Sequence, residues 1–316
     1  MQQQTKRETV GHSFRFAQIS DPHLTSLEGV RASDLMNKRL LGYLSWLKRR
    51  RAEHQRDLLD ALIDDLGRTR PDHLIVTGDL THIGLPDEFR QARQWLQGIG
   101  APEDITVIPG NHDAYTRTRP EQTIDLWTEY MISDPAEYQA TGIFPSLRIR
   151  GPAAIIGLSS ALPTAPFLAT GRVDADQLQA LPSLLDETAR RGLFRILVIH
   201  HSPAAGVDKW RKRLTNRSNL QALLARHGAE LVLHGHTHRA IWSNLPTTGG
   251  PLPVICTPSA SAVGHKAGRR SAYNLYRLEP GEHAWRLVVE THSCAASEEK
   301  FSQTGERELQ IQRPLI

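Results

Sequence analysis

Residues 105–113 read ITVIPGNHD, an apolar, β-branched run that ends in a polar turn. The run Ile105–Ile108 is typical of a short buried strand, and Gly110 marks a sharp turn directly after it. The polar side chains that follow therefore start at the carboxyl end of a strand. This order recurs along the chain, and it decides the predicted fold class.

Four further segments have the same layout. Their strands are predicted at Phe14–Ile19, His73–Thr77, Ile196–Ile199 and Leu231–Leu233. The polar segments that follow them are Asp21-Pro22-His23, Gly78-Asp79, His200-His201 and His234-Gly235-His236-Thr237-His238. In open α/β sheets, residues beyond the carboxyl ends of the strands line the ligand crevice. We therefore expect all five segments to converge on one site.

The remaining pattern predicts one layered α/β domain with helices outside its sheet. Further strands are predicted at Ala153–Leu158, Val254–Thr257 and, as a pair joined at Pro280-Gly281, between Ala272 and Glu290. Apolar residues at helical spacing predict helices at 58–66, 89–96, 174–191 and 218–226. Residues 1–12 are expected to be extended or disordered, 13–295 to form the domain, and 296–316 to be a polar tail with little order.

Composition indicates an ordinary globular protein. Of the 316 residues, 39% are hydrophobic and 23% charged. No apolar stretch approaches the roughly 18 residues of a spanning helix, and Met1–Thr9 lacks the apolar centre of a secretory signal. The two cysteines, Cys256 and Cys294, offer no disulfide framework. We expect a cytoplasmic protein.

The polar segments offer seven candidate metal ligands among their carboxylate, amide and imidazole side chains. Gathering carboxylates and imidazoles in a crevice costs free energy unless a cation compensates. Oxygen and imidazole donors without thiolate suit manganese, iron or zinc. Seven ligands are too many for one tetrahedral ion and suit two ions that share a bridge.

The glycines Gly78, Gly110 and Gly235 each precede a candidate ligand. A sharp turn at a strand end often needs a positive φ, which glycine adopts most easily. We expect this conformation at all three.

Together the five blocks resemble the calcineurin-like metallophosphoesterase superfamily, whose pattern is D-x-H, G-D, G-N-H-[DE], H and G-H-x-H. All five occur in order between Asp21 and His238. The resemblance implies a four-layer α/β/β/α sandwich. It implies a first ion held by Asp21, His23 and His238, and a second held by Asn111, His200 and His236. For the fourth block His201 is the alternative to the preferred His200, and His234, outside the G-H-x-H pattern, is given no metal role. It further implies that Asp79 bridges the ions, that His112 faces the leaving group and that Asp113 orients His112.

Two ions of manganese, iron or zinc would lower the pKa of a bridging water, so that a bridging hydroxide attacks phosphorus directly. His112 would stabilise or protonate the departing oxygen. The block pattern, with Gly-Asp-Leu-Thr at 78–81, is most similar to bacterial cyclic-nucleotide phosphodiesterases. A non-catalytic metal-binding scaffold is the alternative from another class, and the intact Asn111 and His112 favour an enzyme.

An insertion at about 31–56 follows the first block. Between Arg31 and Arg51 there are seven Lys or Arg residues and one acidic residue, Asp34. Residues 35–51 have the pattern of a basic amphipathic helix with Trp46, which is typical of peripheral membrane contact. A lipid-linked phosphodiester or pyrophosphate, of the UDP-diacylglucosamine or phospholipid type, is then the alternative substrate. A helix that caps the domain or joins a homodimer is the competing interpretation.

A second basic stretch, Lys209–Arg213, follows the fourth block. It places Trp210 and Arg211, with His201, as candidate contacts for a substrate phosphate or base. The basic runs are short and no nucleic-acid-binding module is recognisable, so a small phosphodiester is expected rather than nucleic acid.

Overall fold

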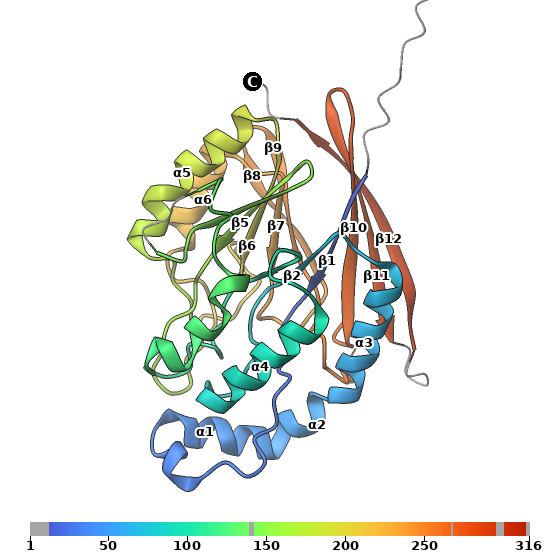
Figure 1. The fold of residues 1–316 in the computed structure, drawn as a ribbon. Helices are drawn as coiled ribbons and strands as arrows, with labels where there is room; N and C mark the ends of the chain where they lie inside the picture. The colour runs from blue at the N-terminus through green and yellow to red at the C-terminus, as the bar shows by residue number, and fades with distance from the viewer. Residues whose placement is uncertain (1–12, 139–141, 267, 295–299, 314–316) are drawn as a thin grey trace, which may run out of the picture.

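The computed structural model describes residues 13–138, 142–266, 268–294 and 300–313. Two six-stranded mixed sheets stack face to face (Figure 1). The first has the order β12-β11-β10-β1-β2-β3. Its strands are β1 Phe14–Ile19, β2 His73–Val76, β3 Ile105–Val107, β10 Ala272–Pro280, β11 Ala284–Cys294 and β12 Phe301–Gln312. In this sheet β1, β2 and β3 run parallel, and β10 pairs antiparallel with β1.

The second sheet has the order β4-β5-β6-β7-β9-β8. Its strands are β4 Ser146–Arg150, β5 Ala153–Leu158, β6 Phe194–Ile199, β7 Leu231–His234, β8 Ile241–Thr247 and β9 Gly250–Cys256. The four central strands are parallel, and β4 and β8 pair antiparallel at the two edges. The sequence pattern did not predict these two edge strands.

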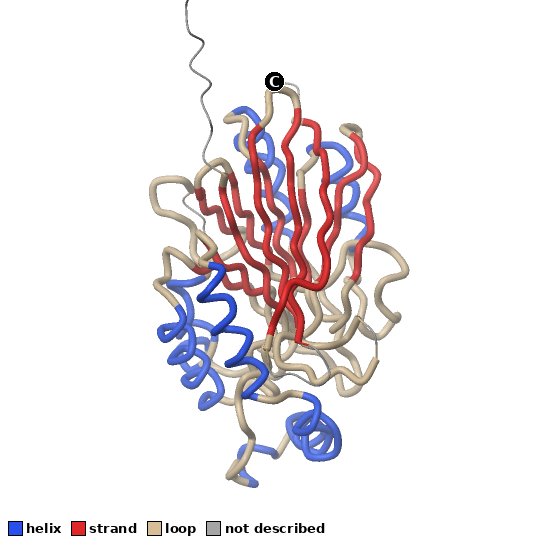
Figure 2. Tube along the Cα trace, turned by 90° about the vertical axis from the view of Figure 1, so that its right-hand side faces the viewer, coloured by secondary structure: helices blue, strands red, loops and turns tan. Residues whose placement is uncertain are grey.

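Helices lie against the outer faces of both sheets, and part of the outer face of the first sheet is left uncovered (Figure 2). They are α3 Arg56–Thr69 and α4 Pro86–Ile99 on the first sheet, and α5 Ala175–Arg190 and α6 Arg217–His227 on the second. The alternation of β1 shows how one strand serves two cores. Phe14 and Phe16 enter the core between the sheets, whereas Ala17 and Ile19 pack under α3 and α4. The predicted α/β/β/α sandwich is therefore confirmed.

The predicted polar tail is wrong for residues 301–312, which form β12. This strand pairs antiparallel with β11 along its length. Its residues are mostly exposed, because it is an edge strand with polar side chains and is held by backbone hydrogen bonds. Residues 1–12, expected to be extended or disordered, lie outside the described part of the chain.

The insertion is helical but broken. It contains η1 Ala32–Leu35, α1 Lys38–Ser45, the π-helical turn η2 Trp46–Arg50 and α2 Arg51–Glu53. It lies beyond the carboxyl ends of the central strands (Figure 1). Arg39 fastens it to the domain by donating to the backbone oxygens of Ile83 and Gly84, at 3.2 and 2.6 Å. Within the described residues, no helix has the length and apolar content that a membrane crossing requires.

The apolar residues of the insertion are divided between two sides. Leu35 and Trp46 are buried in a small core with Ile83. Large apolar side chains on the other side remain exposed by 40–85%: Met36, Leu40, Leu41, Leu44 and Leu47. The insertion therefore packs on the domain with one side and leaves apolar side chains exposed to solvent on the other.

Candidate dinuclear metal site

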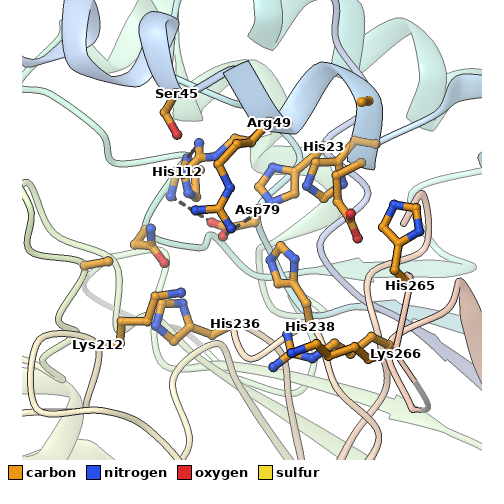
Figure 3. A pocket seen from close by; sticks show the side chains of 17 residues that line it. His23, Ser45, Arg49, Asp79, His112, Lys212, His236, His238, His265 and Lys266 are labelled. Carbon is orange, nitrogen blue, oxygen red and sulfur yellow. Dashed lines mark hydrogen bonds and ion pairs between the residues drawn. The ribbon is translucent and has the colours of Figure 1, made fainter. Parts of the chain in front are cut away.

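The five polar segments converge, as predicted, at one edge of the sandwich. They follow β1, β2 and β3 in the first sheet and β6 and β7 in the second. They surround a cavity of about 740 Å³, lined among others by His23, Asp79, His112, His236 and His238 (Figure 3). The insertion covers one side of this cavity: Ser45 and Arg49 extend from its helix toward His112 and Asp79 (Figure 3).

Two groups of donor atoms share the Asp79 carboxylate. One comprises Asp21, His23, Asp79 and His238, and the other Asp79, His200 and His236; within each group the donor atoms lie within 4.8 Å of one another. Asp79 Oδ2 lies 4.0 Å from His23 Nε2 and 3.3 Å from His200 Nε2. Asn111 Oδ1 lies 3.3 Å from His200 Nε2, so the amide belongs beside the second group.

The chemistry of these donors fits metal ions. His23 and His200 use Nδ1 to contact the backbone oxygens of Thr81 and Thr77, at 2.8 and 2.7 Å. This contact orients each ring and leaves Nε2 for an ion, as outer-sphere partners do in metal sites. His236 Nε2 is buried with no hydrogen-bond partner among the described residues. A buried nitrogen without a partner is costly, and coordination would satisfy it.

Five of the seven candidate ligands have left-handed backbone conformations. Their φ angles are 48° for Asp21, 40° for His23, 59° for Asp79, 69° for His236 and 50° for His238. Each such non-glycine conformation costs on the order of 1 kcal/mol or more, and such costs are concentrated at functional sites. The turns at the strand ends therefore direct these side chains toward one point, and the strained backbone conformations raise the free energy of the folded state.

The three glycines do not share one role. Gly78 has a φ of +96°, as predicted. The prediction is wrong for Gly110 and Gly235, whose φ angles are not in the left-handed region. They are needed for close approach instead, because a Cβ would overlap the Asp79 carboxylate at Gly110 and the Ser20 hydroxyl at Gly235.

The carboxylates attract positive charge. Burial opposes ionisation of Asp21, but the charge of His238, 3.1 Å away, and its hydrogen bond lower the Asp21 pKa. Burial likewise disfavours the charged form of His200, but the Asp79 carboxylate, with further contributions from Asp21 and the Thr77 backbone oxygen, raises the pKa of His200 to about 9.

The contacts of the two neighbouring histidines favour His200 as the candidate ligand. His201 Nδ1 lies 2.8 Å from Ser160 Oγ, and its Nε2 lies 3.2 Å from the backbone oxygen of Ala169. Both of its nitrogens are engaged and the residue is fully buried, so neither the metal nor the predicted substrate role suits it. His200 faces the donor groups.

Asp113 was predicted to orient His112, but the hydrogen bonds of its carboxylate go to other groups. Its carboxylate accepts the backbone N–H groups of Asp79, Gly110 and Thr81 at 2.8, 2.9 and 3.0 Å. It therefore ties the turn after β2 to the turn after β3 and supports Asp79. Both carboxylate oxygens are thus engaged by backbone N–H groups.

His112 is held by other groups. Its Nδ1 donates to the backbone oxygen of His82 at 2.5 Å, which leaves Nε2 for a ligand in the cavity. Arg50 Nη1 lies 3.2 Å from the same Nδ1. Burial, followed by the charge of Arg50, lowers the pKa of His112 well below its usual range.

These features agree with the comparisons with known proteins. The sequence pattern of the family described as calcineurin-like phosphoesterase matches residues 14–240. The chain belongs to this family. The predicted enzyme class, a metal-dependent phosphoric ester hydrolase, is confirmed with it.

Individual relatives agree with the family assignment. The chain is 30% identical to a protein of Synechococcus named a probable cyclic nucleotide phosphodiesterase, over 72% of this chain and 80% of that one. It is 26% identical to a 3′,5′-cyclic-nucleotide phosphodiesterase of Nostoc, over 71% of each chain. A crystal structure of a dimetal phosphatase from Danio rerio superposes with a TM-score of 0.60 at 14% identity, over 95% of this chain and 99% of that one, and supports the fold.

Several residues that line the cavity of this phosphoesterase lie outside the family blocks. Trp210, exposed by 66%, and Arg211 do not line the cavity, whereas Lys212 from the same stretch does. Other basic residues of the lining are Arg49, Arg50, Lys266 and Arg269. The basic character of 31–51 is visible in the sequence, but only the fold shows that two of its arginines face the site.

Proposed function

We propose that this phosphoesterase is a dinuclear-metal phosphodiesterase acting on small phosphodiesters of the cyclic-nucleotide class. The observation that carries the proposal is the pair of donor groups sharing Asp79. The names of the relatives from Synechococcus and Nostoc support the substrate class. The proposed metals are manganese, iron or zinc, which suit oxygen and imidazole donors.

Two metal ions bound by these donor groups would supply an activated water and neutralise charge at phosphorus. Asp79 would contribute its carboxylate to both, and Asp113 holds the Asp79 turn in place. Arg50 and Lys212 bind phosphate oxygens from the cavity wall. His112, fixed through its Nδ1, would present Nε2 toward the leaving oxygen, and it would stabilise or protonate that oxygen only in its imidazolium form. Attack is direct, without a phosphoenzyme.

The test is a substrate panel assayed with metal-free protein and with added Mn²⁺, Fe²⁺ or Zn²⁺. The panel contains cyclic nucleotides, a glycerophosphodiester, a nucleoside-diphosphate lipid and a simple phosphomonoester. We expect metal-dependent hydrolysis of cyclic nucleotides that a chelator abolishes. Turnover of the monoester alone would contradict the proposal, and absence of turnover with every metal would favour a non-catalytic scaffold.

A second candidate is a lipid-linked phosphodiester or pyrophosphate, cleaved by the enzyme attached to the inner face of a membrane. The favouring observation is the exposed apolar side of the insertion, beside a cavity with a basic lining. An apolar face flanked by Lys48 and Arg51 suits an anionic lipid surface. Phosphate in a lipid headgroup would then reach the cavity from the side of the insertion.

We expect the Leu40→Ser, Leu44→Ser, Leu47→Ser triple variant to lose binding to vesicles of 30% anionic lipid by about tenfold or more, since each buried apolar side chain contributes roughly 1.5 kcal/mol or more. Co-sedimentation measures this. Phe167→Ser, at another exposed apolar residue, is the control. Equal vesicle binding by the triple variant would dismiss the candidate. If the wild-type chain forms a dimer in solution and the triple variant is a monomer, the exposed apolar side of the insertion contacts a second copy of the chain instead.

A further inference from the structure

The insertion brings a third histidine to the first donor group. His54 follows α2 and pairs with Ala262 in an isolated antiparallel bridge. The next residue, Gln55, donates its N–H to the Ser261 backbone oxygen at 2.9 Å. The backbone is thus fixed where the insertion rejoins the domain, and the His54 side chain lines the cavity.

The His54 ring lies among the side chains of the first donor group. Its centroid is 4.5 Å from that of His23 and 5.5 Å from that of His238. The donor atoms of these three histidines lie within 4.8 Å of one another, the same proximity that defines the two groups sharing Asp79. Within the described part of the chain, His54 is the histidine outside the motif blocks whose donor atom lies this close to two predicted ligands.

The second ring nitrogen of His54 has the partner that an orienting contact needs. Nδ1 lies 2.9 Å from Ser261 Oγ and 3.4 Å from Ser259 Oγ. Ser259 Oγ in turn donates to the backbone oxygen of Asp21 at 2.7 Å. With Nδ1 engaged by hydroxyls, Nε2 is the nitrogen available to an ion, as it is in His23 and His200. Both serines belong to the segment after β9, so the orienting contact joins the insertion to the second sheet.

We propose that His54 Nε2 is a further ligand of the ion held by Asp21, His23, Asp79 and His238. The inference rests on the proposed dinuclear function and deepens it. A neutral imidazole raises the number of protein donors at the first position from four to five without changing the charge there. The second position, with Asp79, Asn111, His200 and His236, keeps four. Exchangeable positions for water and substrate are therefore concentrated at the second ion.

The test measures metal binding rather than turnover. Chelator-treated protein is titrated with Co²⁺, and binding is followed by calorimetry and by the visible absorption of Co²⁺, which reports on its coordination. We expect two Co²⁺ per wild-type chain. In His54→Ala the affinity for one of the two Co²⁺ ions should fall on the order of 10- to 100-fold, which is at least the loss caused by removing an outer-sphere partner. The visible absorption band of that Co²⁺ should also change.

Three variants make the result specific. His54→Gln preserves polarity and approximate size, so it should show the same loss even if alanine disturbs the loop. Ser261→Ala removes only the orienting hydroxyl and should produce a smaller loss. His265→Ala, at another histidine of the cavity lining, should leave both positions unchanged. Thermal transitions of the metal-free proteins check that each variant is folded.

Unchanged affinity and absorption in both His54 variants would overturn the inference while leaving the proposed function intact. Weaker binding with an unaltered Co²⁺ spectrum would also overturn it, because His54 would then act outside the coordination sphere. Fewer than two Co²⁺ bound by the wild-type chain would instead contradict the proposed dinuclear function.

Discussion

Asp79→Asn is expected to lower the metal-dependent kcat/KM for a phosphodiester by about a thousandfold or more. Asp79 is the one residue shared by the two donor groups, so its charge would act on both of the proposed ions. Metal stabilisation of the reacting charge contributes several kcal/mol, and a factor of ten corresponds to about 1.4 kcal/mol. Losing about 4 kcal/mol of this contribution gives the expected reduction.

Asparagine isolates the effect of charge. Asp79 Oδ1 accepts the backbone N–H of His112 at 2.7 Å, and an amide oxygen can accept the same bond. Activity and bound metal are measured together, and the expected loss of activity accompanies a loss of metal. Asp186→Asn, a carboxylate on α5 that pairs with His227, is the matched control. Retention of a tenth of the wild-type kcat/KM would rule out the bridging role.

Glu230→Ala is expected to lower the free energy of unfolding by about 3–5 kcal/mol, because it leaves a buried guanidinium unpaired. The side chains of Glu230 and Arg195 are exposed by only 3% and 4%. Glu230 Oε2 accepts from the backbone N–H and Nε of Arg195 at 2.6 and 2.9 Å, and Oε1 accepts from Nη2 at 2.6 Å. The pair joins the start of β6 to the residue before β7, so its loss affects two strands that lead into the site.

Urea unfolding measures the difference. The control is Asp60→Ala, which breaks an exposed ion pair with Arg56 one turn apart on α3. Such exposed helix pairs contribute about 0.5 kcal/mol or less. A change for Glu230→Ala no larger than that for the control would show that the buried pair is unimportant for stability.

Local pattern predicted most of the central fold. Apolar runs at Phe14–Ile19, Ala153–Leu158 and 196–199 form strands that the structure confirms, because strands buried on both faces are apolar at nearly every position. Edge strands lack this signal. β12 is mostly exposed and depends on β11 for its hydrogen bonds, so its residues alone resemble a polar tail.

The candidate site was predictable where its residues follow strand ends. Asp21, Asp79 and His236 lie beside the cavity because parallel strands bring their carboxyl ends to one edge. Assignments based on which group a side chain faces were less secure. Asp113 meets amides rather than His112, and His201 turns both nitrogens into the protein.

The amino-acid sequence by itself determined which chemistry is available: carboxylate, amide and imidazole donors, each at the end of a strand and in one order. Only the tertiary structure decided which of these donor atoms lie together. It also decided that Arg50 and His54 of the insertion line the cavity, whereas Leu40 and Leu44 are exposed. The physical reason is the distance along the sequence over which each interaction acts. Strand and turn propensities act over a few residues, whereas the direction of a side chain on the insertion depends on contacts with Ile83 and Ser261, distant in the sequence.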